Sequence, residues 1–318
     1  MKKILNGQSL PLSSLAPLDF AAFSNALEKE VSSGKRVCAY FGVPGADKNL
    51  VECFAVLADD KRNQLLVGRS VIEGGSFPSL ALRCPQVHLF EREIAEQFGL
   101  KAVGHPWFKP VRYVRSWTGL DAWDRPSGEE ILPACGDFYR VEGQQIHEVG
   151  VGPVHAGVIE PGHFRFQCYG EEVYHLEIAL GYQHRGVEKA LCGGPDARTI
   201  HYMETLSGDS TVAHATSYSQ LVEALSLEQV PARAQWLRGI ALELERLANH
   251  IGDLGALSMD VGFLPTSSFC GRIRGELLNM TALLCGNRFG RGMVRPGGTG
   301  YDVDEERTAE LLRRLEIN

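Results

Sequence analysis

The sequence lacks the short cysteine spacings that mark metal clusters and redox pairs. Its eight cysteines are scattered, and no two of them form a C-x-x-C pair. Zinc ribbons and iron-sulfur sites held within one chain normally use such pairs. Scattered thiols in a chain without an export signal are typical of reduced, mostly buried side chains rather than of a disulfide framework. The usual signature of an internal zinc or iron-sulfur site is therefore missing.

Long apolar runs and an excess of positive charge are also missing. No stretch reaches the roughly 20 apolar residues that a transmembrane helix needs. The basic residues 1–8 are followed by polar residues rather than by the apolar segment of a signal peptide. Thirty-two Lys and Arg stand against 39 Asp and Glu, a net charge of −7, which offers no overall attraction to nucleic acid. These absences predict a soluble, cytoplasmic protein that binds no nucleic acid.

No G-x-G-x-x-G fingerprint follows a predicted strand. Gly150-Val151-Gly152 runs into a proline, and the glycines of residues 297–300 follow Arg295-Pro296. P-loop, Ser-His-Asp and metalloprotease motifs are absent as well. A nicotinamide or nucleotide site is therefore not expected in this chain.

The first 120 residues predict a small α/β domain. Apolar residues at helical spacing indicate a helix over 18–33, with Asp19 as its N-cap and Gly34 after its end. Three β-rich runs follow, separated by turn residues, and a short helix ends at Gly99. The strands are expected over 36–43, 51–57 and 64–71, and the short helix over 90–98.

The sequence from about residue 116 to 145 loses its periodicity and collects Gly, Pro, Asp and Glu. It predicts a linker over 121–145, between a first domain of residues 1–120 and a second of residues 146–318. Two domains suit a chain of 318 residues with 44% hydrophobic residues.

The second domain is predicted to open with a β-hairpin and to continue as helices. Residues 164–168 and 176–180 alternate around a turn, and helices are expected over 210–225, 231–254 and 268–285. The helix over 231–254 has a stripe predicted to face the core, and His250 on it is interpreted as a hydrogen-bonded core residue. The members of this stripe are Leu237, Ile240, Leu244, Leu247, Ile251 and Leu254.

Three strings of the second domain carry a resemblance. They are residues 152–165 (GPVHAGVIEPGHFR), 181–189 (GYQHRGVEK) and 291–298 (RGMVRPGG). They resemble the large subunit of energy-converting nickel-iron hydrogenases, the hydrogenase III type of formate hydrogenlyase, and, less closely, the 49 kDa-subunit family of complex I. Residues 90–99 (FEREIAEQFG) and 104–107 (GHPW) resemble the 30 kDa-subunit family of complex I.

The resemblance implies an α+β chain that fuses the two complex I families. A 30 kDa-like α/β domain would precede a β-hairpin and a mainly α-helical, 49 kDa-like domain. That second domain is expected to be incomplete, because the family's C-terminal C-x-x-C would lie past residue 318. A truncated chain, a broken reading frame and a natural short form are all compatible with the sequence.

The family holds its nickel-iron centre with four thiolates, and this chain lacks the first pair. Ser207 and Ser210 stand where the resemblance places those cysteines, while Glu204, Gly208 and His214 still match. Nickel prefers soft thiolate there, whereas a serine hydroxyl is a hard, protonated donor. We therefore expect no metal in this chain, and we interpret Ser207 or Ser210 as a helix N-cap.

The resemblance implies catalytic roles for four residues around the hairpin. Glu160 is the candidate for proton transfer, with His155, His163 and Arg165 beside it in the sequence. The alternative is an ordinary ion pair between Glu160 and Arg165. In complex I the matching loop lines a quinone pocket, so His155 is also a candidate donor to a quinone carbonyl, although Gly208 stands where that family has its tyrosine.

The resemblance also implies partners. His184, Arg185, Glu188 and Lys189 lie in a segment that faces the 4Fe-4S small subunit in the family, and the alternative is a solvated helix face. The chain is then part of a membrane-associated hydrogenase or NADH:quinone oxidoreductase-like complex on the cytoplasmic face of the inner membrane, reaching membrane subunits indirectly. A catalytically inactive scaffold, or a truncated remnant of a hydrogenase III large subunit, is the alternative function.

Overall fold

The structure, a computed structural model, describes residues 1–47, 50–132, 138–155 and 161–317. Helix and sheet are mixed, in agreement with the predicted α+β class. The chain forms two compact units, Met1–Asn6 with Leu10–Arg185 and Gly7–Ser9 with Gly186–Asn318. Within the described ranges, no helix combines the length and the apolar character that crossing a bilayer requires.

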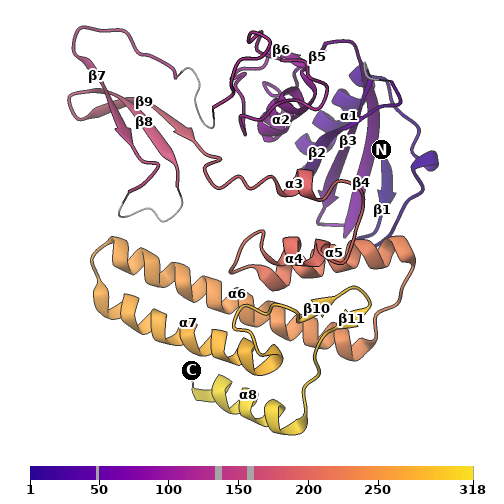
Figure 1. The fold of residues 1–318 in the computed structure, drawn as a ribbon, viewed down its shortest axis with the longest axis vertical. Helices are drawn as coiled ribbons and strands as arrows, with labels where there is room; N and C mark the ends of the chain where they lie inside the picture. Colours follow the sequence, from indigo (N-terminus) through magenta and orange to yellow (C-terminus); the bar gives the residue numbers. More distant parts are fainter. Residues whose placement is uncertain (48–49, 133–137, 156–160, 318) are drawn as a thin grey trace. The chain divides into compact units, whose positions relative to one another are not determined.

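The first unit is built on a four-stranded antiparallel sheet in the order β1-β4-β3-β2 (Figure 1). The three predicted strands are confirmed, whereas β1 is too short to show a periodic pattern. The strands are β1 (Lys2–Ile4), β2 (Arg36–Pro44), β3 (Leu50–Asp59) and β4 (Gln64–Glu73).

Two helices, α1 (Phe20–Ser32) and α2 (His88–Phe98), pack against the face of this sheet that carries Cys53 and Ala55. Helix α1 begins as predicted, since the Asp19 carboxylate accepts hydrogen bonds from the first free backbone N–H groups of the helix, at 3.0 and 3.3 Å. Helix α2 ends at Gly99, whose φ of 67° favours glycine. Short elements complete this part: η1 (Leu12–Ser14), β5 (Ser76–Pro78), η2 (Pro85–Val87) and β6 (Lys101–Val103).

Most charged side chains of the FEREIAEQFG string are buried, and they form hydrogen bonds mainly with backbone N–H and carbonyl groups. Glu91 is fully buried and accepts hydrogen bonds from Leu80 N at 2.8 Å and from Ser79 Oγ at 2.5 Å. Burying a carboxylate is costly unless such donors replace water. Burial raises the pKa of Glu91.

The next turns of α2 hold the irregular segment after residue 104. The Arg92 guanidinium donates to the carbonyl oxygens of Lys109 and Pro110, at 2.6 and 2.9 Å. The Glu96 carboxylate accepts from the N–H groups of residues 111, 112 and 114, at 2.8 to 3.2 Å. A segment without helix or strand thus gains a fixed path along α2.

A second, three-stranded sheet consists of β7 (Ile146–Val151), β8 (His163–Tyr169) and β9 (Glu172–Ala179), all antiparallel. The predicted β8–β9 hairpin is confirmed, and β7 is a further strand beside it. Glu177 of β9 forms an ion pair with Lys109, which joins the sheet to the segment after α2 within the first unit. The assignment of residues 1–120 and 146–318 to two protein families stays a prediction.

The second unit is mainly helical, and its longest helices, α6 and α7, pack side by side (Figure 1). Their core joins Leu244 and Ala248 of α6 to Leu277 and Met280 of α7. The elements are α3 (Val187–Ala190), α4 (Thr199–Glu204), α5 (Thr211–Ser226), α6 (Ala232–Asp260), α7 (Leu264–Cys285), β10 (Val294–Arg295), β11 (Gly298–Thr299) and α8 (Glu305–Ile317).

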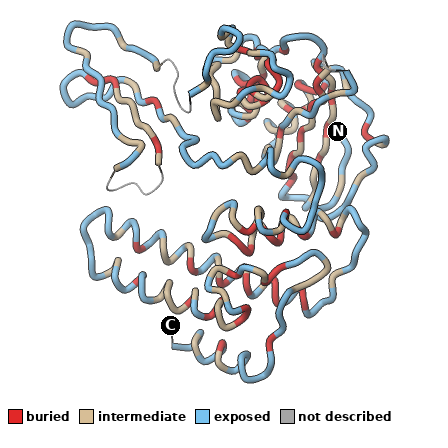
Figure 2. The backbone as a smooth tube through the Cα atoms, viewed as in Figure 1, coloured by how far each residue is buried: buried red, intermediate tan, exposed pale blue. Residues whose placement is uncertain are grey.

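The predicted helices over 210–225, 231–254 and 268–285 are confirmed, but the predicted core stripe of α6 is partly wrong. Leu237 and Leu244 are buried, whereas Ile240, Leu247 and Leu254 are 45%, 42% and 53% exposed. Figure 2 shows buried and exposed positions mixed along α6. Apolar residues occupy more than one face of this helix, and periodicity does not tell which face meets α7. His250 is exposed, so its interpretation as a core residue is also wrong.

A buried ion pair joins α5, α6 and the RGMVRPGG string. The Arg238 guanidinium donates to both carboxylate oxygens of Glu223, at 2.6 and 3.1 Å, and the two side chains are 7% and 9% exposed. Arg238 also donates to the carbonyl oxygens of Arg295 and Gly298, and Glu223 accepts from Gly297 N at 2.8 Å. The hairpin of β10 and β11 is thereby fixed against both helices.

Replacing Arg238 should destabilise the second unit. Arg238→Met leaves a buried carboxylate without its partner, which costs about 3–5 kcal/mol. The matched control is Arg246→Met on the same helix, because the Arg246–Glu243 pair is exposed and worth about 0–1 kcal/mol. Hydrogen exchange of the α5 and α6 amides measures both, and equal protection in the two variants would contradict the role of the pair.

Glu91 should make the stability of the first unit depend on pH. Because its pKa is raised on folding, the folded state binds the proton more tightly than the unfolded chain. The free energy of unfolding of the wild type, relative to Glu91→Gln, should therefore fall as pH rises above the ordinary carboxyl pKa of about 4.3. Denaturant unfolding of both proteins across this range tests the sign, and a constant difference would refute it.

Candidate functional site

The loop that enters the hairpin is closed by two histidines. His163 Nδ1 lies 3.2 Å from the carbonyl oxygen of Gly152, and His155 Nε2 lies 3.3 Å from that of Gly162. Each histidine therefore binds the opposite end of the loop. The candidate catalytic residue Glu160 belongs to residues 156–160, which lie outside the described residues.

Gly152 is required for this closure. Its φ is +86°, and a Cβ there would stand 2.1 Å from the Gly162 oxygen and 2.7 Å from His155 Cδ2. Only glycine combines this conformation with such a close approach. The positive φ and the close approach therefore explain why the GPVH string begins with a glycine.

Arg165 lies on the strand after the loop and has partners of its own. Its Nη1 donates to Glu148 Oε2 at 2.7 Å, and its guanidinium lies 4.5 Å from the centre of the Phe138 ring. The same ring meets His163 edge to face at 5.6 Å. His155, His163 and Arg165 are therefore brought together in the first unit, and their catalytic roles remain predictions.

The residues that match the family's first ligand segment form a loop in the second unit, between α4 and α5. Glu204 is 3% exposed, and its Oε1 accepts from Gly292 N at 2.7 Å. Its own carbonyl oxygen accepts from Thr211 Oγ1 at 3.0 Å. Asn249 of α6 donates to the Asp209 carbonyl oxygen at 3.0 Å. Both ends and the middle of the loop are thus held by protein groups.

Ser207 and Ser210 have hydroxyls that do not fit a nickel site. Ser207 Oγ donates to Asp209 Oδ1 at 2.8 Å, as a protonated hydroxyl does. Serine offers a hard neutral oxygen where nickel in this family takes soft thiolate. Throughout the described ranges, no three His, Cys, Asp or Glu side chains are grouped so as to hold a metal ion.

The prediction that Ser207 or Ser210 is a helix N-cap is confirmed for the position of Ser210 in the chain, but not for its side-chain hydrogen bond. Ser210 occupies the N-cap position of α5, but its side chain makes no capping hydrogen bond. The Glu245 carboxylate of α6 performs this role, accepting from Val212 N at 2.7 Å and Ala213 N at 3.0 Å. Burial raises the pKa of Glu245. No local pattern indicates this cap, because its donor and acceptor lie 33 residues apart.

The predicted docking segment is exposed. His184, Arg185, Glu188 and Lys189 all have exposed side chains, and Gly186 between them has a φ of 66° before the short helix α3. The arrangement is compatible with both predictions, the docking segment and the solvated surface.

Comparison with known proteins identifies relatives of the chain. It is 31% identical over 264 residues to hydrogenase-4 component G of Escherichia coli strain K12, covering 78% of this chain and 47% of the relative. It is 29% identical over 252 residues to formate hydrogenlyase subunit 5 of the same organism, covering 75% and 44%. It is 25% identical over 287 residues to the NADH-quinone oxidoreductase C/D protein of Acidiphilium cryptum, covering 83% and 48%. The chain thus spans about half the length of the curated relatives it matches.

A solved structure supports the fold. The membrane-bound sulfane sulfur reductase, an archaeal respiratory membrane complex, matches with a TM-score of 0.52 and 22% identity, over 56% of this chain and 48% of that one. No protein-family model matches the chain. The predicted resemblance to energy-converting hydrogenase large subunits with complex I homology is confirmed by these relatives.

The loop closure predicts the effect of a methyl group at Gly152. Gly152→Ala should open the loop, because the added Cβ meets backbone and the histidine ring. The matched control is Gly170→Ala in the hairpin turn, where φ is also positive but no atom lies within 4 Å, so only the backbone cost of about 1–2 kcal/mol applies. Hydrogen exchange of the β7 and β8 amides should rise more in Gly152→Ala, and the opposite order would contradict the closure.

Proposed function

Because the homologues of this chain are hydrogenase-4 component G, formate hydrogenlyase subunit 5 and the C/D proteins of NADH-quinone oxidoreductase, we propose that it serves as the large subunit of a membrane-associated redox complex of this kind. In this proposal it docks on a 4Fe-4S small subunit and has no nickel-iron centre of its own. It reaches the membrane through its partners.

One observation carries the nickel-free proposal. The loop of residues 204–211 is held by hydrogen bonds of Glu204, Asp209 and Thr211, and it has hydroxyls at both candidate ligand positions. Since the frame is satisfied by protein donors and acceptors, its fold does not call for a metal. In this proposal the chain keeps the place of a large subunit in the complex without the ligand chemistry.

Proton transfer and quinone binding are the chemistry we propose for the hairpin loop. His155 and His163 are oriented by carbonyl oxygens, and Arg165 places a fixed positive charge beside them. Such a cluster can donate hydrogen bonds to a carbonyl or stabilise a nearby carboxylate. Glu160 is the proposed proton carrier, and His155 is the proposed donor to a quinone carbonyl.

The two hydroxyls also favour a second candidate, a scaffold that keeps the docking surfaces and performs no redox step. The redox subunit and the scaffold predict different turnover when a quinone is supplied to the purified complex. Turnover that falls in His155→Ala, while the set of co-purifying partners is unchanged, supports the redox role, whereas absence of turnover supports the scaffold.

Metal content of the native complex tests the nickel-free proposal. The full chain is purified with its partners from its own source. The iron content of this complex should match that of a 4Fe-4S subunit, and its nickel content should be only a trace. Formate hydrogenlyase purified by the same protocol is the positive control. Stoichiometric nickel in the complex would overturn the proposal, and absence of any iron-sulfur partner would refute the docking.

A further inference from the structure

The GHPW string (residues 104–107) plays no part in the proposed function, and its histidine is bound at both ring nitrogens. His105 Nε2 lies 3.0 Å from the carbonyl oxygen of His88, and the backbone N–H of Trp107 donates to His105 Nδ1 at 3.0 Å. A carbonyl oxygen can only accept, so Nε2 carries the hydrogen, and Nδ1 offers its lone pair to Trp107. The two contacts therefore fix the neutral ring in one tautomer.

The surroundings of the His105 ring disfavour a positive charge on it. Burial lowers the pKa of His105, and the charges of Arg92 and His88 on α2 act in the same direction. Burial lowers the pKa of His88 as well. The carboxylates of Glu96 and Glu177 favour the positive charge of Arg92. The ring is thus held neutral beside a guanidinium that stays charged.

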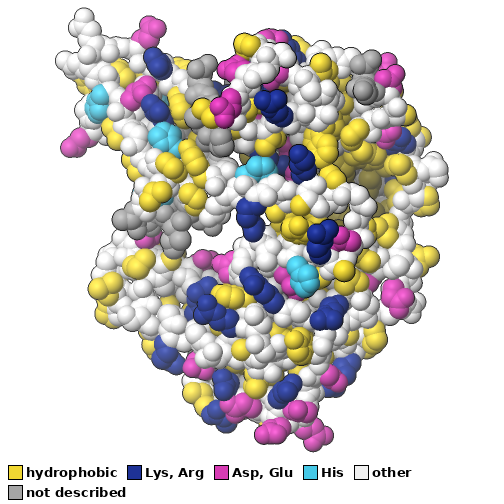
Figure 3. Space-filling view, in the orientation of Figure 1, with side chains coloured by type: hydrophobic (Ala, Val, Ile, Leu, Met, Phe, Trp, Pro, Cys, Tyr) yellow, Lys and Arg dark blue, Asp and Glu magenta, His cyan; other side chains and the backbone are white. Residues whose placement is uncertain are grey.

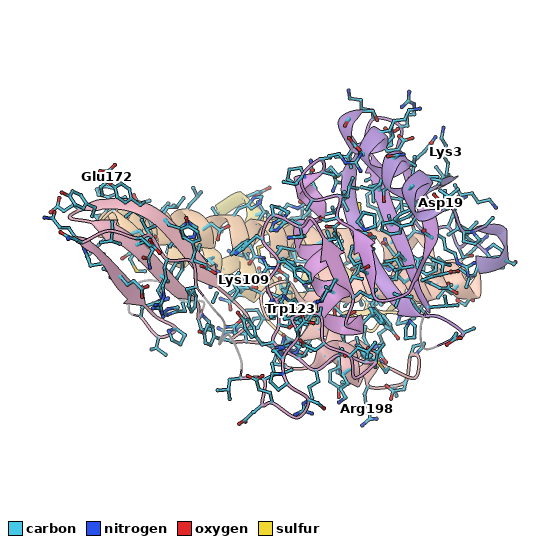
Figure 4. All side chains as sticks on the ribbon, turned by 90° about the horizontal axis from the view of Figure 1, so that it is seen from above. Lys3, Asp19, Lys109, Trp123, Glu172 and Arg198 are labelled. Atoms are coloured by element: carbon cyan, nitrogen blue, oxygen red, sulfur yellow. The ribbon has the colours of Figure 1, made fainter. Side chains whose placement is uncertain are left out.

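The charged groups on the neighbouring segment are engaged with other partners. Residues 121–125 pack on Phe108, where Trp123 stacks on the ring at 5.1 Å and its Nε1 donates to the Phe108 carbonyl oxygen at 3.2 Å. Figure 4 shows Trp123 close to Lys109, the next residue along the chain. The acidic and basic side chains of residues 121–125 pair with one another or with Lys101 of β6. They are therefore not available to stabilise a charged His105 ring.

His105 and Arg92 hold the two ends of a short segment against α2. At the first end, Nδ1 binds the Trp107 N–H, and the Trp107 ring lies over the Arg92 guanidinium, with its centre 4.6 Å from the guanidinium carbon. At the second end, Arg92 donates to the carbonyl oxygens of Lys109 and Pro110. The path of residues 105–110 thus depends on a lone pair at Nδ1 and on a cation next to it.

We propose that His105 is a pH-sensitive switch that releases Trp107 from α2 when Nδ1 takes a proton from solvent. The protonated ring has a donor at each nitrogen, so the Trp107 N–H loses its acceptor and faces another N–H. The imidazolium also repels the Arg92 guanidinium on which the Trp107 ring lies.

The sign of the pH dependence follows from the neutral state of the bound ring. The closed form loses stability as the pH falls below about 6.5, the ordinary histidine pKa that the ring regains in the open form. The switch is independent of the proposed function, because its contacts lie within α2 and residues 104–110. Failure of the switch would therefore leave the proposed function standing, and the reverse also holds.

Hydrogen exchange of the full chain tests the switch. The protection of the Trp107 amide is its exchange rate relative to that of the unstructured peptide at the same pH. It should fall about fivefold between about pH 7.5 and about pH 5.5, because one neutral hydrogen bond is lost as the ring titrates. The β3 amides of the same unit are the internal reference, since unfolding of the whole unit would lower their protection too. Constant protection of Trp107, or an equal fall in β3, would overturn the proposal.

His105→Asn separates titration from packing. The asparagine Oδ1 can accept the Trp107 N–H in place of Nδ1 but binds no proton in this range, so the pH dependence should disappear. A control is needed because Figure 3 shows histidine side chains at several places on the face drawn. The matched control is His147→Asn, which removes an exposed histidine of the same unit. Persistence of the pH dependence in His105→Asn, or its loss in His147→Asn, would contradict the switch.

The tautomer of His105 supplies a readout that needs no variant. In the wild-type chain, nitrogen-15 chemical shifts of the histidine rings should show the His105 hydrogen on Nε2 and a bare Nδ1 at about pH 7.5. The proton that arrives on acidification should appear on Nδ1, with a midpoint below about 6.5. A hydrogen on Nδ1 at about pH 7.5, or a midpoint above 6.5, would refute the proposal even if the asparagine variant did not fold.

Discussion

Buried charge that must find partners is the constraint on which both units depend. A carboxylate or guanidinium removed from water is destabilising unless donors and acceptors of the protein replace the solvent. In this chain those partners are mostly backbone groups, which Glu91 and Glu96 bind in irregular segments of the first unit and Arg238 binds in the short β10–β11 hairpin of the second. The helices thus fix loops that have little regular structure of their own.

The same constraint explains why certain strings of the sequence are informative. The alternating charges of FEREIAEQFG look like a solvated helix face, yet Glu91, Arg92 and Glu96 are almost fully buried. The RGMVRPGG string supplies the carbonyl and N–H groups that Arg238 and Glu223 bind. Several residues of these two strings thus bind partners that lie 11 to 74 residues away in the chain.

Local elements could be predicted from the sequence, and long-range partners could not. The N-cap of α1 and the glycine that ends α2 depend on neighbours within four residues, so the pattern found both. The buried face of α6 depends on where α7 lies, and Ile240 and Leu254 were misassigned for that reason. At the candidate site, the loop histidines and the two serines were found by resemblance. Glu245 and Glu223 were not, because their partners come from other helices.

The loop of residues 204–211 is closed without the side chains at its two candidate ligand positions. In a site folded by metal, removal of the ligands removes folding energy. Here Glu204 binds Gly292, Thr211 binds Glu204, and Asn249 binds Asp209, so the loop is closed by hydrogen bonds that do not involve Ser207 Oγ or Ser210 Oγ. Substitution at the two positions then costs the fold little. The loop that enters the hairpin is also closed by local contacts, which His155 makes with Gly162 and His163 makes with Gly152. The hydrogen bonds that close the two loops are therefore separate from the side chains at the two candidate ligand positions.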